Sequence, residues 1–498
     1  MHFSILPPLL HQSAHTTVIL TLAVVLVSGC ANMAGIAPHA KPTDSNSLAL
    51  GSAMGGTAVD GHWPGNAWWQ TFSDPQLDAL VQQAVSGSSN LKIARARIEQ
   101  ARALAGIARA GTLPQVGAKA EFTRERFTEQ GLVPSPLAGN WDWDNEIAMK
   151  ASYDLDLWGK ESSALDAALS AAQVSAAEAR SVQLNLETAV VRSYLQLSLQ
   201  YALRDIAEAT LRQQESIVSI ARRRLTAGLG TQLDLSQAET ALPNSRAEIE
   251  QVDEAIALLR NQIAALSGQG PGAGDAIRRP SLAQQRDTAQ PPISLPDNVP
   301  ANLIGRRPDV VAQRWRVEAA GKNIDVAKAA FYPDINISAF LGFQSLGFAG
   351  LLTSASGMRG IAPAISLPIF EGGRLRGKLG AETAAYDAAV ESYNNTLVLA
   401  LQSAADQIVK LKSSAQQQRH SQQALALAQK SYDIAQNGFH AGLTEYLSVL
   451  NAQTSLLRQQ QRVAQARNAY LDAWVQLMQA LGGGLGDDLP TPPAQAAL

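Results

Sequence analysis

The pattern of apolar and polar positions divides the chain into two very long helices and several short strands. Residues 160–226 contain no proline and are dominated by alanine, leucine, glutamine and arginine, and residues 374–440 form a second stretch of the same length. These residue types favour helices. A helix over 160–226 would be about 100 Å long at roughly 1.5 Å per residue. Helices of globular domains are much shorter, so these two are predicted to span a distance.

Two pairs of segments alternate between apolar and polar residues with a period of two. In the first pair, residues 116–125 and 145–157, alanine, valine, isoleucine and other apolar residues alternate with charged ones such as Lys119, Glu121 and Asp154. The second pair, 335–343 and 361–369, is apolar on one face and less charged on the other. An apolar face opposite a charged face is typical of transmembrane barrel strands. The sequence therefore predicts four such strands.

Aromatic residues lie at both ends of the predicted strands, where interfacial girdles are expected. One group is Trp158, Phe331, Tyr332 and Phe370, and the other is Phe127, Trp141, Trp143 and Phe348.

Two similar turns indicate that the chain is a tandem duplication. Residues 227–240 and 441–454 are identical at six of fourteen positions, at an offset of 214. A repeat at a fixed offset indicates duplication. Each half reads helix, strand, strand, long helix, turn and return helix, with the short helices expected over 76–111 and 309–330 and the return helices over 231–267 and 444–481. We assign the first repeat to 76–267, a connector to 268–305, the second repeat to 306–481 and a tail to 482–498.

Two local features of the repeats are a proline within the first return helix and a charged segment at the start of the second repeat. Pro243 is expected to kink the first return helix, because proline removes a helical hydrogen bond. The charges of Arg306, Arg307 and Asp309 are expected to form a solvated helix start, with a specific contact as the alternative.

The N-terminus predicts export and lipidation. Residues 18–27 form a short apolar run that small residues follow, which is typical of a signal peptide, here assigned to 1–29. Val27–Cys30 resembles the bacterial lipoprotein box, which implies a diacylglycerol and an N-acyl chain on Cys30 and a place in the outer membrane. The rest of the segment 30–75 includes an extended tether, 31–62, rich in Gly, Ala, Ser and Pro.

A pair of tryptophans and a helix start follow the tether. Trp68 and Trp69 are expected to pack in a core or interface. Ser73 or Asp74 would cap the next helix, with Pro75 at its first position.

Composition excludes several classes of function. The formal net charge of −3, from 40 basic and 43 acidic residues, gives no polycationic footprint for nucleic acid. No apolar run approaches the roughly 20 residues of a membrane-spanning helix, so any crossing would use strands. A nucleophile elbow, paired zinc ligands and a phosphate loop are missing from the sequence. We therefore expect no enzyme, no metal and no cofactor beyond the covalent lipid.

Four strands require partner chains. An open sheet edge is not tolerated in lipid, so several copies must share one barrel. Two copies would give eight strands and a filled interior, whereas three would give twelve and room for water. Charged inner faces favour the trimer. The predicted fold is an α+β membrane protein, a trimeric channel-tunnel with a 12-strand transmembrane β-barrel, four strands per chain, continued by a long α-helical coiled-coil barrel.

The turns at the far ends of the long helices are the candidate functional tips. Gly228 suits a left-handed helix cap, and Gly442 occupies the same place in the second turn. Thr231 and Asp234 have the spacing of a capping box. Asp234 could therefore be a helix cap or a residue facing the pore.

Several motifs together resemble the outer membrane factor family, which includes TolC-like channels and NodT-type efflux lipoproteins. They are the lipobox, Trp68-Trp69 with Asp74-Pro75, residues 153–160 (YDLDLWGK), Arg306–Asp309, residues 367–373 (LPIFEGG) and both tips. The resemblance covers nearly all of residues 63–482. It implies a homotrimeric channel-tunnel in the outer membrane, docked by a periplasmic adaptor protein to an inner-membrane pump, usually of the resistance-nodulation-division class. The chain would be a passive exit duct for small compounds.

The resemblance also assigns the tip residues. Family members narrow the tip with apolar and acidic residues; the matching positions are Leu447 and Asn451, where an aspartate is common. The tip or gate set is Asp234, Glu445, Leu447 and Asn451, and the turn residues expected to dock the adaptor are Gly228, Leu229, Gly442 and Leu443. Metal or polypeptide export stays open within this class. The alternative from another class is a non-conducting structural coiled-coil lipoprotein held to the outer membrane by Cys30.

Overall fold

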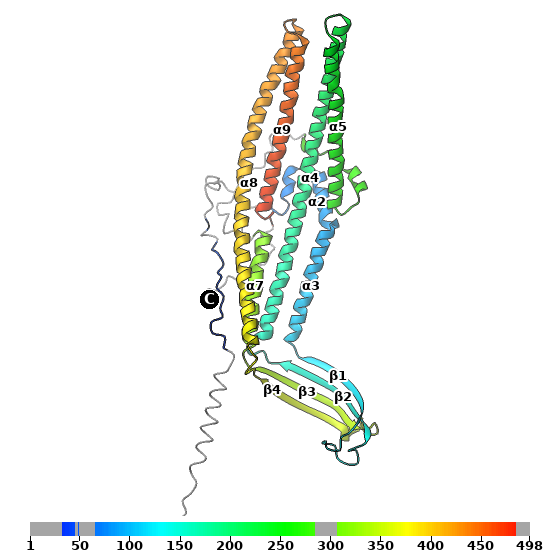
Figure 1. The fold of residues 1–498 in the computed structure, drawn as a ribbon, viewed down its shortest axis with the longest axis vertical. Helices are drawn as coiled ribbons and strands as arrows, with labels where there is room; N and C mark the ends of the chain where they lie inside the picture. The colour runs from blue at the N-terminus through cyan, green and yellow to red at the C-terminus, as the bar shows by residue number, and fades with distance from the viewer. Residues whose placement is uncertain (1–31, 45–47, 49–64, 284–305, 485–498) are drawn as a thin grey trace, which may run out of the picture. The chain divides into compact units, whose positions relative to one another are not determined.

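The computed structural model of the chain describes residues 32–44, 48, 65–283 and 306–484 (Figure 1). The predicted signal peptide and Cys30 lie outside the described residues, as do most of the tether, part of the connector and most of the tail. The chain forms two compact units, and each takes residues from both repeats. Of the described residues, unit 1 comprises 32–42, 98–174 and 313–393, and unit 2 comprises 43–44, 48, 65–97, 175–283, 306–312 and 394–484.

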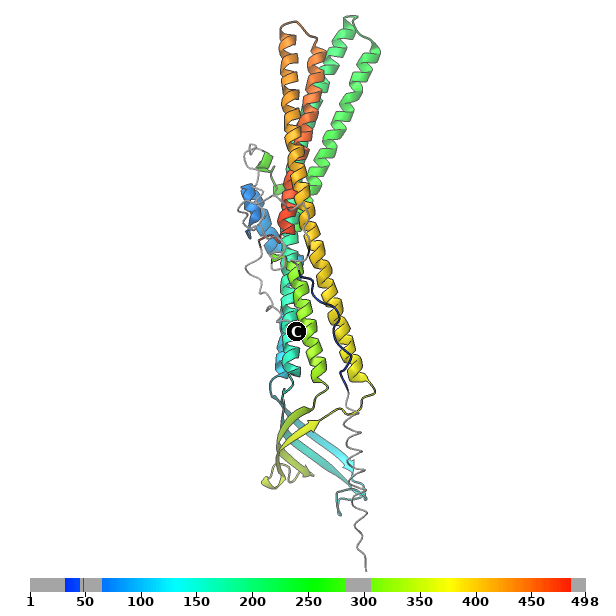
Figure 2. The same cartoon turned by 90° about the vertical axis from the view of Figure 1, so that its left-hand side faces the viewer.

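Unit 1 contains one antiparallel sheet of four strands in the order β1-β2-β3-β4, labelled in Figure 1. Figure 2 shows the same sheet turned by 90°. The strands are β1 (Gln115–Arg126), β2 (Trp141–Asp154), β3 (Asp334–Leu346) and β4 (Gly357–Ser366). The register places Ala120 opposite Ile147 and Ile147 opposite Phe343. One position along, Glu121 pairs with Glu146, and Glu146 pairs with Gln344. The predicted apolar and charged faces therefore line up across strands from both repeats.

Two strands end earlier than the alternation predicted. The alternation predicts a second strand that includes Leu155 and Leu157, but β2 ends at Asp154. The Asp156 carboxylate instead accepts hydrogen bonds from the backbone N–H groups of Glu161 (3.0 Å) and Ser162 (2.8 Å). Such bonds satisfy donors at a helix start, so the chain leaves the sheet here. Leu367 and Ile369 likewise lie beyond β4, next to Pro368, which cannot donate to a ladder.

The long helices have the predicted bounds. They are α4 (Lys160–Thr226) and α8 (Arg374–His440), and their return helices are α5 (Gln232–Leu266) and α9 (Tyr446–Ala480). α5 continues through Pro243. α7 covers Pro308–Ala329. In the described ranges, no helix combines the length and the apolar character needed to cross a membrane.

The single helix predicted over 76–111 is two helices, α2 (Pro75–Gly87) and α3 (Ser89–Gly111), separated at Ser88. Gly87 lies against the end of α5. A Cβ atom at Gly87 would come within 2.2 Å of the Ser267 oxygen, and one at Gly268 within 2.5 Å of the Gly87 oxygen. This close backbone packing between distant segments ends α2, and the local periodicity does not reveal it.

Unit 2 buries the tryptophan pair and the start of α2. Trp68 and Phe72, from the 3-10 helix η2 (Trp68–Phe72), lie 5.9 Å and 5.4 Å from Trp474, measured between ring centroids. Of the two predicted caps, Ser73 and Asp74, it is Asp74 that caps α2, by accepting from the Gln76 N–H (3.0 Å); Asp74 also accepts from the Tyr194 hydroxyl (2.8 Å). The predicted core role of the tryptophans is confirmed.

Arg307 contradicts the expectation of a solvated helix start. Its side chain is only 15% exposed and makes two hydrogen bonds to Asp309, of 3.0 Å and 2.6 Å. It also donates to the carbonyls of Ala400 and Ala480, each at 3.3 Å. Ala480 ends α9, and a cation at a helix C-terminus is stabilising. The Arg307 guanidinium therefore joins three helices.

Part of the predicted tether is docked rather than free. The backbone N–H groups of His39 (2.9 Å) and Ala40 (3.0 Å) donate to the Asp387 carboxylate on α8. Met33 and Ile36 pack against a cluster of Ile324, Ala327 and Leu379. Residues 32–40 therefore follow a fixed path in unit 1.

Candidate functional site

The first tip turn, in unit 2, is closed by a left-handed glycine. Gly228 has φ +72° just after α4 ends. The Leu229 N–H then donates to the Arg224 carbonyl at 2.8 Å. A residue in this conformation followed by such a bond is a common helix end, and glycine adopts it without a Cβ clash. The predicted role of Gly228 as a helix cap is confirmed.

α5 begins with a capping box. The Asp234 N–H donates to Thr231 Oγ1 (3.2 Å), and the Thr231 N–H donates to Asp234 Oδ2 (2.8 Å). The hydrogen bonds from Thr231, more than the positive charge of Arg224, lower the pKa of Asp234 below its ordinary value. Asp234 has two predicted roles, helix cap and pore-facing residue, and these hydrogen bonds are those of a helix cap.

The second tip has the same backbone and different side-chain contacts. Gly442 has φ +73°, and the Leu443 N–H donates to the Gly438 carbonyl at 2.8 Å. Glu445 occupies the N-cap of α9, yet its side chain makes no capping hydrogen bond within the described part of the chain. Instead, Phe439 packs on Tyr446, with 5.0 Å between ring centroids.

Both tips expose apolar side chains. Leu229 is 70% exposed, Leu443 81% and Leu447 52%. Asn451 is also exposed, four residues after Leu447 and thus on the same face of α9. Of these exposed leucines, Leu229 and Leu443 lie at the two turns where the adaptor is predicted to dock.

A buried glutamine connects the two helix pairs below the tips. The Gln213 side chain, on α4, is 2% exposed and donates through Nε2 to the Leu450 carbonyl and to Thr454 Oγ1 (2.8 Å) on α9. The sequence does not predict this contact, because a glutamine that bonds a distant helix has the same place in a helical pattern as a solvated one.

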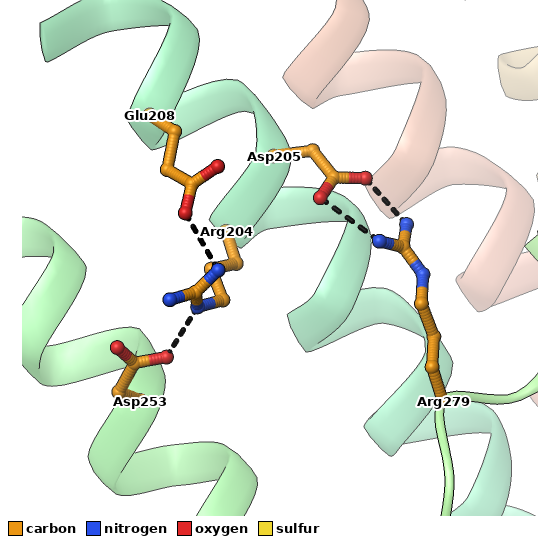
Figure 3. Close-up of polar contacts among 5 residues, drawn as sticks. All are labelled: Arg204, Asp205, Glu208, Asp253 and Arg279. Carbon is orange, nitrogen blue, oxygen red and sulfur yellow. Dashed lines mark hydrogen bonds and ion pairs between the residues drawn. The ribbon is translucent and has the colours of Figure 1, made fainter.

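An ionic cluster joins α4, α5 and the connector farther down (Figure 3). Arg204 bonds Asp253 and Glu208, each at 2.6 Å, and Arg279 makes two hydrogen bonds to Asp205. Such pairs contribute little individually when exposed, but a network fixes geometry. The cluster therefore holds the connector and α5 against α4.

A buried acid lies on α4 in unit 2. Glu187 is 2% exposed, and burial raises its pKa to about 7, although the Gln183 hydrogen bond and the charge of Arg180 act in the opposite direction. Glu187 is therefore partly protonated at neutral pH. Among the described residues, no group of three or more His, Cys, Asp or Glu side chains could hold a metal ion.

Comparisons with known proteins agree on one family. The family model described as outer membrane efflux protein matches residues 80–269 and 299–483. The fusaric acid resistance protein FusA of Burkholderia cepacia is 44% identical over 380 residues, which cover 75% of this chain and 71% of that protein. The multidrug resistance outer membrane protein MdtP of Escherichia coli (strain K12) is 30% identical over 484 residues, or 93% and 95% of the two chains.

A solved structure extends the comparison to the fold. The outer membrane protein VceC from Vibrio cholerae is 34% identical in sequence, with a TM-score of 0.76. The alignment covers 85% of this chain and 100% of that chain. Its fold matches the long helices and four-stranded sheet described above. The chain belongs to the outer membrane efflux protein family.

Proposed function

We propose that the protein is the outer membrane exit channel of a tripartite efflux system and acts as a homotrimer. The observation that carries the proposal is the sheet: its apolar and charged faces are in register, and β1 and β4 are its two edges. An open edge exposes unpaired backbone groups, which lipid does not tolerate. Three copies would pair these edges in a twelve-stranded barrel with the charged face inside.

The tips are the proposed periplasmic end of the channel. A periplasmic adaptor protein would dock on the exposed turns, through Gly228, Leu229, Gly442 and Leu443. The passage would be narrowed by Asp234, Glu445, Leu447 and Asn451. An inner-membrane pump, of the resistance-nodulation-division class, would supply the energy, and the chain itself would be a passive duct and not an enzyme.

Cys30 is the proposed lipid attachment site. A diacylglycerol and an N-acyl chain there would anchor the protein in the outer membrane. The docked path of residues 32–40 supports this proposal, since the segment that follows Cys30 in the sequence is bound to α8.

The proposed cargo is small organic compounds. FusA is named for fusaric acid resistance and MdtP for multidrug resistance, and a similar cargo is proposed for this chain. Export of metals or of polypeptides is the alternative within the channel class, and the pump decides among them.

Conductance tests the proposal. Purified protein should have the mass of a trimer in detergent and should give discrete ion-conducting steps in a planar bilayer. A trimer that never conducts, even with Leu447→Ala and Asn451→Ala, would favour a structural stalk. A closed barrel should also migrate differently on gels before and after boiling.

Asn451 tests the gate assignment. Asn451→Asp should raise single-channel cation selectivity, because a ring of carboxylates attracts cations. Unchanged selectivity would remove Asn451 from the gate.

A further inference from the structure

A cavity of about 480 Å³ lies in unit 1 where the strands end and the long helices begin. We name it the junction cavity; its lining includes Asp154, Trp158, Tyr332, Asp334, Leu367 and Lys378. By register, Asp154 pairs with Asn336 and Asp334 with Ser366, so both carboxylates belong to the charged face of the sheet. The volume falls in the range of roughly 300–1,000 Å³ that is typical of small-molecule sites. The proposed channel function assigns no role to this cavity.

One part of the lining is a preformed aromatic surface. The rings of Trp158 and Tyr332 stack with 4.7 Å between centroids and 17° between planes. The Trp158 Nε1–H donates to the Pro333 carbonyl at 2.8 Å, which fixes the indole. Trp158 is still 48% exposed and Tyr332 41% exposed. A fixed and accessible pair of rings can take up an apolar body with little loss of conformational freedom.

Some of the charged groups of the cavity already have partners. Arg374 pairs with Glu371, and Lys160 pairs with Glu161 at 3.3 Å. The Asp156 carboxylate accepts N–H groups at the start of α4. These groups maintain the walls of the cavity.

Three charges of the cavity have no ion-pair partner among the described residues. Asp154 accepts a hydrogen bond only from the neutral amide of Asn336. Asp334 and Lys378 line the same cavity and make no side-chain hydrogen bond or ion pair in the described ranges. The cavity thus presents two uncompensated carboxylates and one uncompensated ammonium group beside an aromatic surface. A ligand that carries only a negative charge would be repelled by both carboxylates. A ligand that carries only a positive charge would leave the Lys378 ammonium group without a partner.

We infer that the junction cavity binds a zwitterionic amphiphile. Its ammonium group, which must carry an N–H donor, would lie against Asp154 and Asp334, its phosphate or carboxylate against Lys378, and its apolar body on Trp158 and Tyr332. Charge-assisted hydrogen bonds of this kind are stronger than neutral ones. Two sources share this chemistry: a phospholipid with a phosphoethanolamine headgroup, and a soluble zwitterionic compound in transit. The inference does not depend on conductance, so the two proposals can fail separately.

Calorimetric titration of the full-length protein in detergent tests the inference. The first probe is dihexanoylphosphatidylethanolamine, and the matched probe is dihexanoylphosphatidylcholine, whose quaternary ammonium has no N–H donor. The ethanolamine lipid should bind at least tenfold more tightly. Equal affinities for the two lipids would overturn the contact between ammonium and carboxylates.

Variants locate the binding. Asp334→Asn and Lys378→Gln should each weaken binding of the ethanolamine lipid at least tenfold, whereas Lys378→Arg should retain it. Lys328→Gln, an exposed lysine of unit 1 outside the lining, is the matched control and should bind normally. Asp334 and Lys378 are exposed, so the thermal unfolding midpoint should not change. Binding that is the same in all four variants would overturn the site.

A second probe distinguishes the sources. Norfloxacin carries an ammonium and a carboxylate on one aromatic body. Binding of norfloxacin that Lys378→Gln abolishes would identify a compound in transit. Binding of the ethanolamine lipid that norfloxacin does not displace would identify a lipid site. Failure of both probes to bind would overturn the inference.

Discussion

The two tip turns have the same backbone but are stabilised by different chemistry. Each has a left-handed glycine, Gly228 or Gly442, followed by a 2.8 Å hydrogen bond that closes the turn. The first turn continues into the reciprocal cap of Thr231 and Asp234. The second has no such cap in the part of the chain that is described, and packs Phe439 on Tyr446 instead.

This difference separates what duplication has kept from what it has changed. The glycines and the closing bond determine the path of the chain, so both copies need them. The cap depends on an ionised carboxylate, whereas the aromatic pair depends on apolar contact. The two ends of the helices should therefore respond alike to backbone changes and differently to pH.

The largest expected effect comes from a residue away from both tips. It should change the free energy of unfolding of the whole protein, and not the stability of one turn. Glu187→Gln removes an acid whose folded pKa of about 7 exceeds its ordinary 4.5. Below pH 4.5 the acid is protonated in both states; as pH rises towards 7 the unfolded state ionises first, so the folded state loses stability. At pH 8 the substitution should raise the free energy of unfolding by about 3 kcal/mol.

Denaturant unfolding at pH 8 and pH 4.5 measures this effect. The gain should nearly vanish at pH 4.5. Glu248→Gln, at an exposed position of α5, is the control and should change little at either pH. An equal gain at both pH values would contradict the assignment to ionisation.

The next effect tests what the two tips share. Gly228→Ala and Gly442→Ala should each destabilise the local turn by about 1–2 kcal/mol, because a Cβ is disfavoured in the left-handed conformation. Amide hydrogen exchange of the two turns should show similar losses of protection. Gly106→Ala is the matched control: it lies within α3 with open space around a new Cβ and should stabilise slightly. A loss of protection at one tip only would show that the two turns do not depend equally on their glycines.

A smaller effect tests what the tips do not share. Thr231→Ala should cost about 1 kcal/mol at the first tip, the usual value of an N-cap. Glu445→Ala, at the equivalent position, should cost much less, because its side chain makes no capping bond in the described structure. Hydrogen exchange of the first turns of α5 and α9 compares them. Equal costs would show that Glu445 contributes a cap after all.

The smallest effect is a pH dependence confined to one tip. The pKa of Asp234 is lowered, so its cap contributes stability above the ordinary value of 3.8 and loses it as pH falls through the folded pKa. Acidification below pH 3.8 should therefore reduce protection at the start of α5 relative to α9. Asp234→Asn should abolish this difference. A parallel change at both tips would place the titrating group elsewhere.

Much of the architecture was predictable because its causes are local. The composition of residues 160–226 and 374–440 is sufficient to predict their helices, and alternation predicts the strands and their two faces. The capping box at Thr231 follows from residue type and spacing, and the same signals limit the cap of α2 to Ser73 or Asp74. Each of these features depends on residues within a few positions, so the sequence contains the whole cause.

Contacts between residues that lie far apart in the chain were decided by the tertiary structure alone. α2 ends where Gly87 meets Ser267 and Gly268, and Arg307 is buried because it reaches Ala400 and Ala480. Gln213 bonds a helix more than 200 residues away in the chain. The junction cavity likewise collects its charges from strands and helices of both repeats. No periodicity specifies such contacts, because they depend on which surfaces the folded chain brings together.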